Sequence, residues 1–435
     1  MNVEVDVGAE MHRWASDLFP ICRSLTGDGV RQTLRYFHNF LPSLAVHEVP
    51  SGTRAFDWTV PPEWNIRDAY VADDTGRRVI DFREHNLHVV GYSEPVDTWL
   101  TLDELQPRLY STPEQPDAIP LVVSYYTRTW GFCLRHRDRQ KLRSGRYHVV
   151  IDSTLDPSGH LTYGELLLPG ESADEVLVSC NICHASMANN ELSGPVVVAA
   201  LARWLMSAPR RLSYRIVFIP ENIGSLVYLS RNLAAMKERT IAGFVVSCAG
   251  DERVYSMVAS RLGDTLTDRL LRHVLRHHAD VFKEYAYLWP HRGSDERNYC
   301  SPGVDLPVVA FTRSKYGEFP EYHTSLDDLS FVTPRGLAGS FDVLKKCVSI
   351  LEGNKTYRLN CLGEPRLGPR GLYPSMNKPG SGYEEDLTKL MNVIAYCDGN
   401  HSVLDIAERI GIPAWHCLPV IDRLRQEQLV EEAMR

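Results

Sequence analysis

The 435-residue sequence has no apolar run near the ~20 residues that a membrane-spanning helix requires. Its first residues, Met1–Asp6, lack the basic and apolar segments of a signal peptide. Basic charge is also in deficit, because the net charge is −8 and the pI is about 6.1. These absences predict a cytoplasmic protein with no membrane partner, and they argue against a general nucleic-acid-binding surface.

A disulfide framework is missing as well. Ten cysteines are spread over the whole chain, and in the cytoplasm we expect them to be reduced. The segment Cys180–His184 matches the C-x-x-C-H pattern of c-type haem attachment, but that modification requires export and no export signal is present. Cys180 and Cys183 are therefore predicted to be small buried residues, with a nucleophilic Cys183 as the alternative.

From residue 162 the chain alternates apolar strands with amphipathic helices. Each strand runs into a polar loop, which predicts a mostly parallel central sheet with helices on both faces and a site at the carboxyl ends of its strands. The pattern predicts strands over 175–179, 214–219, 241–247 and 307–311, and helices over 194–206, 226–236, 264–278 and 334–351.

Two further regions have a different pattern of apolar and polar residues. Residues 9–41 predict two helices, the second over 30–40, and the Thr26–Gly29 turn between them is either a capped turn or an anion site. Residues 46–159 contain short β runs broken by Gly, Pro and Asp, such as 87–90 and 121–126, and predict an inserted β-rich domain. The α/β domain is thus expected to be discontinuous, over residues 1–45 and 160–355.

The C-terminal region begins with a predicted linker, residues 360–382, which holds five Gly and four Pro. Residues 383–435 then predict a helix-turn-helix domain of winged type. This domain carries ten acidic and five basic residues. Because phosphate contacts supply most of the affinity for DNA, its charge of −5 makes nucleic acid an unlikely partner and favours packing or partner docking.

Several motifs together resemble a cytoplasmic family of aminopeptidase-like proteins often encoded near polysaccharide or natural-product biosynthesis genes. That family is similar to the single-domain zinc aminopeptidases, and its members have an inserted β domain and a C-terminal winged helix. The resemblance covers nearly the whole chain and rests on these segments: Arg23–Gly29, Phe56–Pro61, Tyr125–Tyr126, Trp130–Cys133, Gly293–Arg297 and Tyr322–Asp327.

The resemblance implies metal-assisted hydrolysis of an amide, in which zinc holds a carbonyl oxygen and a water, and a carboxylate takes the proton of that water. The family's ligand loop corresponds to Asn181–Gly194 in this chain. Asn181 stands where the family has a ligand His, and Asn190 where it has a ligand Asp. Neutral amides are poor zinc ligands, so we expect at most one zinc ion, with a metal-free site as the alternative.

The remaining candidates lie in loops that follow predicted strands. For catalysis the sequence offers two residues, Glu221 and His184. The candidate metal ligands that the resemblance implies are His323, Asp251 and, as an alternative to its role as base, Glu221. The candidate substrate contacts are Asp295, Arg297, Tyr322 and Asn190, of which Arg297 and Tyr322 suit a substrate carboxylate.

Three functions follow from these residues. The first is an aminopeptidase-fold enzyme with an altered metal site, which acts on an amide or aminoacyl bond of a small peptide or biosynthetic intermediate. The second is a catalytically inactive protein that binds a peptide or protein in the cleft where the related enzymes have their active site. The third is a metal-independent acyl-transfer or cyclisation enzyme. The sequence leaves homo-oligomer formation open.

Overall fold

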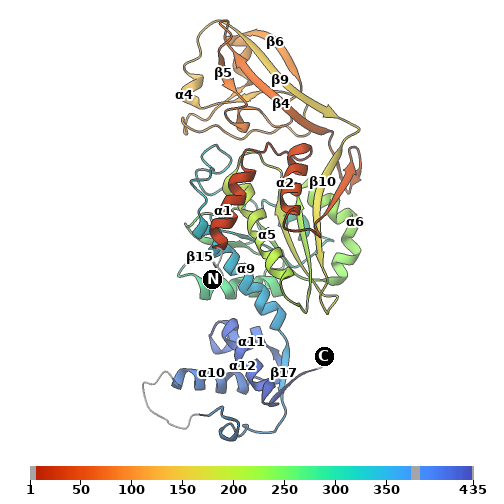
Figure 1. Ribbon diagram of the computed structural model, residues 1–435, viewed down its shortest axis with the longest axis vertical. Coiled ribbons are helices and arrows are strands. Elements are labelled where there is room, and N and C mark those ends of the chain that lie inside the picture. The colour runs from red at the N-terminus through yellow and green to blue at the C-terminus, as the bar shows by residue number, and fades with distance from the viewer. Residues whose placement is uncertain (1–5, 374–382, 434–435) are drawn as a thin grey trace. The chain divides into compact units, whose positions relative to one another are not determined.

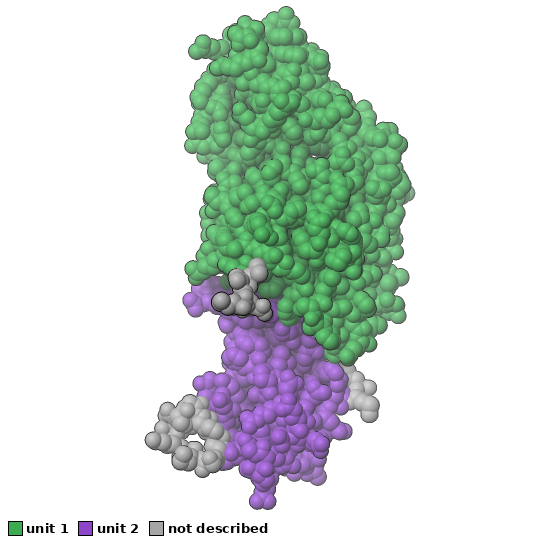
Figure 2. Space-filling view, viewed as in Figure 1, with its two compact units in different colours: residues 1–268, 283–341 green, residues 269–282, 342–435 purple. Residues whose placement is uncertain are grey.

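The computed structural model describes residues 6–373 and 383–433. The chain divides into two compact units, Met1–Asp268 with Lys283–Phe341 and Arg269–Phe282 with Asp342–Arg435 (Figure 2). The first unit contains the large sheet and the β-rich segment. The second contains most of α7, the later part of α9 and the C-terminal module.

The first unit is built around an eight-stranded mixed sheet. Its order is β1 (Ala45–Pro50), β10 (His160–Leu168), β12 (Ser213–Ile219), β11 (Glu175–Asn181), β13 (Thr240–Val246), β16 (Val308–Thr312), β14 (Tyr255–Val258) and β15 (Phe282–Tyr285). The strands β12, β11, β13 and β16 are parallel, whereas β1, β10 and β14 pair antiparallel. The parallel sheet predicted from the sequence is thus the centre of a mixed one.

The parallel centre of the sheet is buried on both faces. Every residue of β11 and β16 is buried, as expected for strands covered by helices on both faces. The covering helices include α5, which packs on β11 and against α1, and α2, which packs on β10 (Figure 1). The helices that lie wholly or partly in this unit are α1 (Val7–Leu18), α2 (Asp28–His38), α5 (Ser193–Met206), α6 (Ile223–Arg239), α7 (Leu266–His278), α8 (Glu296–Tyr299) and α9 (Pro334–Gly353).

The β-rich segment has its own four-stranded antiparallel sheet, drawn in orange and yellow in Figure 1. Its order is β5 (Arg78–Asp81), β4 (Glu63–Ala72), β9 (Arg146–Asp156) and β6 (Val96–Thr101). Two small sheets join β2 (Arg54–Ala55) with β3 (Trp58–Thr59) and β7 (Leu109–Tyr110) with β8 (Phe132–Cys133). Two short helices, α3 (Leu102–Leu105) and α4 (His136–Arg139), complete the segment.

Three local predictions were wrong. Residues 121–126 form no strand and make only an isolated bridge between Gly91 and Val123. Residues 86–88 form a 3₁₀ turn, because the His85 ring accepts the Leu87 N–H at 3.1 Å. The second helix begins at Asp28 rather than Val30, and the Asp28 N–H at its start is taken by the Asn65 side chain at 2.8 Å. The first N–H group of α2 is therefore capped by a side chain of β4.

The C-terminal module combines a three-stranded sheet with three helices. The sheet order is β18 (Asp398–Ser402), β17 (Thr356–Leu359) and β19 (Val430–Glu432), and the helices are α10 (Tyr383–Ala395), α11 (Val403–Ile410) and α12 (Ala414–Gln426). This sheet begins before the predicted linker, of which residues 374–382 lie outside the described part of the chain. The sequence pattern predicts the two helices of the helix-turn-helix over 403–410 and 414–426, and the structure has α11 and α12 at these residues.

Candidate active site

The loop after β11 is the centre of the candidate site. It leaves the sheet at Asn181, passes through a π-helical turn, Ala188–Leu192, and enters α5 at Ser193. The side chain of Asp327 fixes this turn by accepting the backbone N–H groups of Asn189 and Asn190 at 2.5 and 2.9 Å. Since every residue of the turn is buried, its polar groups need such partners.

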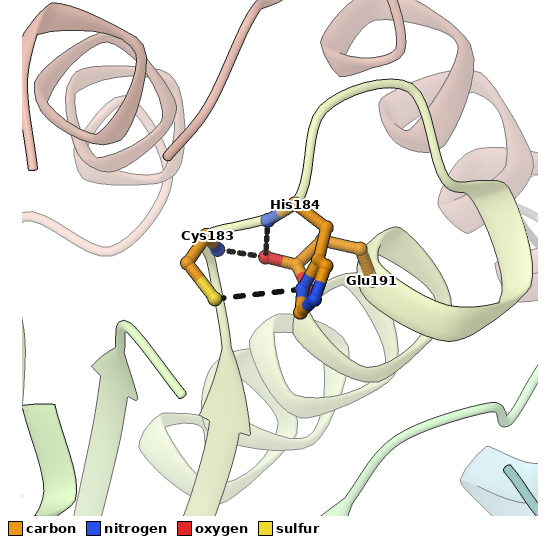
Figure 3. A group of neighbouring side chains, drawn as sticks. All are labelled: Cys183, His184 and Glu191. Carbon is orange, nitrogen blue, oxygen red and sulfur yellow. Dashed lines mark hydrogen bonds and ion pairs between the residues drawn. The ribbon is translucent and has the colours of Figure 1, made fainter. Parts of the chain in front are cut away.

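His184 and Glu191 form a buried pair inside this loop (Figure 3). His184 Nδ1 lies 2.8 Å from Glu191 Oε2, and Glu191 Oε1 accepts the backbone N–H groups of Cys183 and His184. Burial alone would lower the pKa of His184, but the Cys183 and Glu191 groups outweigh it and hold that pKa well above its usual value. Burial also raises the pKa of the Cys183 thiol to about 12.

Glu221 follows β12 and is the partly exposed carboxylate of the cluster, with 19% of its side chain accessible. Ser294 Oγ donates to Glu221 Oε1 at 2.7 Å, and Asn181 Nδ2 donates to Ser294 Oγ at 3.2 Å. Glu221 Oε2 lies 3.9 Å from His184 Nε2. The structure thus brings together the two predicted catalytic residues, Glu221 and His184, in a hydrogen-bonded cluster.

His323 borders the same cluster. Its ring lies 5.4 Å from that of His184 and stacks on Tyr322 at 3.8 Å between centroids. The backbone φ of 56° places His323 in the left-handed region, and His323 Nε2 has no hydrogen-bond partner among the described residues. Burial, and then His184, lower the pKa of His323 to about 3, so this ring is neutral.

The other predicted site residues have partners of their own. Asp251 accepts four hydrogen bonds, from Asn189 Nδ2, Arg253 N, Ser314 N and Ser314 Oγ. Asp295 Oδ1 accepts the Asn222 N–H and the Ser225 hydroxyl, both at 2.7 Å, while burial and then Glu221 raise the pKa of Asp295 to about 8.

Arg297 and Asn190 also contact neighbouring side chains. Arg297 donates from Nε, at 2.9 Å, and from Nη2 to Asn222 Oδ1. Asn190 Nδ2 faces Cys248 Sγ at 3.8 Å, and Asn190 Oδ1 is buried without a partner among the described residues. The four predicted substrate contacts, Asp295, Arg297, Tyr322 and Asn190, therefore stay predictions.

Sequence reasoning missed Glu191, Ser294 and Asp327. Glu191 is the charged residue directly before the Leu-Ser-Gly start of α5, and that position was the available signal. Ser294 precedes a predicted site residue but carries no charge, and Asp327 ends a quoted motif without an assigned role. The partners of Ser294 and Asp327 lie 73 and 138 residues away, so spacing does not reveal them.

The metal-ligating groups of this site do not suit a pair of zinc ions. In the described part of the chain a single group of three such side chains has its ligand atoms within 4.8 Å, namely Cys183, His184 and Glu191. These atoms already hydrogen-bond to one another or to backbone N–H groups. The two buried amide oxygens, Asn181 Oδ1 and Asn190 Oδ1, are neutral donors of low zinc affinity.

Comparisons with known proteins define the class of this fold. The chain has an aminopeptidase-like α/β fold with a C-terminal winged helix-turn-helix, which matches residues 355–432. A zinc aminopeptidase from Bacillus subtilis superposes with a TM-score of 0.55 at 12% identity, over 77% of this chain and 93% of that one. At this identity the likeness concerns the fold alone.

The chain also belongs to a sequence family that is more specific than this fold class. Residues 12–354 match the domain of unknown function DUF4910, and the chain belongs to that family. A Clostridium acetobutylicum relative, provisionally named a polysaccharide biosynthesis protein with aminopeptidase-like domain, is 42% identical over 98% of this chain and 97% of its own. A crystal structure of a provisionally assigned peptidase from Clostridium acetobutylicum superposes with a TM-score of 0.91 at 40% identity, over 98% of this chain and 96% of that one.

The comparisons confirm the fold class and the resemblance to the aminopeptidase-like family. The described residues, 6–373 and 383–433, also include no helix with the length and apolarity of a membrane span.

Proposed function

We propose that this chain is an aminopeptidase-fold enzyme with an altered metal site, which acts on an amide or aminoacyl bond of a small peptide or biosynthetic intermediate. The observation that carries the proposal is the position of Glu221 at the carboxyl end of β12. Its carboxylate is partly exposed, is held by Ser294 at 2.7 Å and faces His184 Nε2 at 3.9 Å. Ligands of α/β proteins bind at this edge of the sheet.

In the proposed reaction Glu221 is the general base. A carboxylate that is fixed at one oxygen and open at the other can take a proton from a water or from the substrate. His184 is oriented by Glu191 at Nδ1 and presents Nε2 toward Glu221, so it is suited to return a proton or to hold the carbonyl oxygen. Because Glu221 Oε1 is tied to Ser294, Oε2 is the oxygen left for proton transfer.

We expect Glu221→Gln to lower kcat/KM by about 100-fold or more, because the amide keeps the shape of the side chain but is not a base. The measurement is release of p-nitroaniline from a panel of aminoacyl p-nitroanilides, followed by mass-spectrometric analysis of dipeptides. Glu171→Gln, at an exposed position, is the matched control and should retain full activity. A wild-type protein that binds these compounds but turns none over would support the binding-protein alternative instead.

We also propose that the winged-helix module docks on protein rather than on DNA. The recognition helix of a helix-turn-helix reads bases through its N-terminal residues. In this chain the first N–H of α12, on Ala414, donates to His273 Nε2 of α7 at 2.9 Å, and Lys346 of α9 lies 4.9 Å from the Trp415 ring centroid. The start of α12 is therefore occupied within the second unit.

For this module we expect no measurable binding of a fluorescent 30-base-pair duplex at 150 mM salt, with a Kd weaker than about 100 µM. Fluorescence anisotropy of the full chain is the measurement, repeated at 50 mM salt. Binding tighter than about 1 µM that weakens steeply with salt would contradict the docking proposal.

A further inference from the structure

Zinc is the metal that the fold implies, because a zinc aminopeptidase shares it. A catalytic zinc ordinarily takes three protein ligands from His, Asp, Glu or Cys and keeps one open position. In residues 6–373 and 383–433 the group of such side chains close enough to share an ion is Cys183, His184 and Glu191. The question is whether their ligand atoms are available.

Cys183 and Glu191 have their ligand atoms in hydrogen bonds, and His184 has its Nδ1 bound to Glu191, which leaves only its Nε2 uncommitted. Glu191 accepts three hydrogen bonds, two from backbone N–H groups and one from His184 Nδ1. Cys183 Sγ accepts the Glu221 N–H at 3.1 Å. An ion on Glu191 Oε2 would displace the His184 hydrogen bond, and an ion on Glu191 Oε1 would compete with two buried backbone donors, at a cost of about 1–3 kcal/mol for each donor left unpaired.

The neighbouring atoms do not supply an alternative set. Asp251 is saturated by four donors, and Asn181 and Asn190 contribute uncharged oxygens. His323 Nε2 is a buried imidazole nitrogen of this site that has no hydrogen-bond partner among the described residues. His184 Nε2 and Glu221 Oε2 remain, 3.9 Å apart, but among the described residues no third His, Cys, Asp or Glu side chain completes a group of ligand atoms within 4.8 Å with them. Two such ligands and neutral amides fall short of the three protein ligands that a catalytic zinc takes.

We infer that this site operates without zinc, and that Asn181 and Ser294 hold the Glu221 carboxylate by hydrogen bonds where a zinc enzyme would hold it near a metal ion. The inference rests on the proposed function of Glu221 and adds to it the way in which that residue is positioned. Asn181 donates to Ser294 Oγ at 3.2 Å, so the hydroxyl hydrogen is directed at Glu221 Oε1, 2.7 Å away. Asn181 is thus a positioning residue in this chain.

The inference makes Asn181 and Asn190 the reason for weak zinc binding. Their oxygens are buried and unpartnered, so a histidine and a carboxylate at these positions would add two ligand groups to the site. We expect Asn181→His with Asn190→Asp to tighten zinc binding by about 100-fold or more, since it adds two ligands and one negative charge.

The experiment measures zinc directly, so it does not depend on the substrate. Protein purified without a metal-affinity tag is dialysed against a chelator and titrated with zinc chloride in competition with a fluorescent zinc indicator. Circular dichroism and the Tm check that each variant is folded. The matched control, Asn360→His with Asn400→Asp, adds the same two groups at exposed positions.

The zinc titrations distinguish a zinc-free site from a zinc site. Wild-type protein is expected to retain less than about 0.1 zinc per chain, and His323→Ala should leave its residual zinc affinity unchanged. Stoichiometric zinc in the wild type that His323→Ala removes would overturn the inference. If the double variant does not fold, the wild-type and His323→Ala titrations decide it alone. If the wild type is active without zinc and Glu221→Gln loses this activity, both proposals are supported. If the wild type is zinc-free but inactive, this inference stands and the proposed function is wrong.

Discussion

Replacing Glu191 by Ala is expected to lower the free energy of unfolding by about 3–5 kcal/mol, because it breaks a buried charged pair. The side chain of Glu191 is fully buried, and it is the partner of His184 Nδ1 and of the Cys183 and His184 N–H groups. Without it, these three buried donors lose their acceptor. Urea denaturation followed by near-ultraviolet circular dichroism gives the loss.

Glu191→Gln is the matched control. Its amide oxygen still accepts from the backbone, but the negative charge beside His184 is gone, so we expect a loss between that of the Ala variant and zero. An Ala variant within about 1 kcal/mol of the wild type would show that the pair contributes little to stability.

The same comparison has a defined pH dependence. The folded-state pKa of His184 lies above the unfolded value of about 6.5, so the pair's contribution is complete below about pH 6.5 and is lost as the pH rises through the folded pKa. The stability advantage of the wild type over Glu191→Gln should therefore shrink from pH 6 to pH 9. An advantage that grows over this range would mean that His184 is neutral in the folded protein.

The sheet was predictable because its strands leave an unambiguous pattern. Val176–Val178 and the later apolar runs are buried on both faces, and each is followed by polar residues that cannot continue a buried strand. The same reasoning failed for residues 121–126, where an equally apolar run forms no strand. None of these residues is buried, and Val123 and Tyr126 are exposed, so a short apolar run does not by itself distinguish a strand from a half-buried loop.

The candidate site was predictable only by location. Glu221 and Asn181 come to the same edge because parallel strands end there, and sequence order is enough to infer it. The contact that gives Glu221 its orientation comes from Ser294, 73 residues away, and the one that fixes the π-helical turn comes from Asp327. Such hydrogen bonds depend on tertiary packing and leave no local pattern.

Gly194 connects the fold to the site, and its replacement has the second large expected effect. It lies in the first turn of α5, where an added Cβ would be 2.3 Å from the carbonyl oxygen of Val246 in β13. A backbone atom of a central strand cannot move aside, so α5 would have to shift. We expect Gly194→Val to cost more than about 3 kcal/mol of unfolding free energy, at the upper end of overpacking effects.

The shift would also disturb the loop, which ties the prediction to function. Ser193 Oγ donates to Asn189 O and accepts the Ala249 N–H at 2.7 Å, so displacing α5 moves the turn that carries Glu191. Urea unfolding gives the stability change, and an NMR shift of the His184 ring reports the loop. Gly145→Ala, whose added Cβ meets no atom closer than 4.0 Å, is the control and should change neither readout. A folded Gly194→Val protein of wild-type stability would mean that α5 and β13 are not in this close contact, and that the loop is not fixed by the sheet.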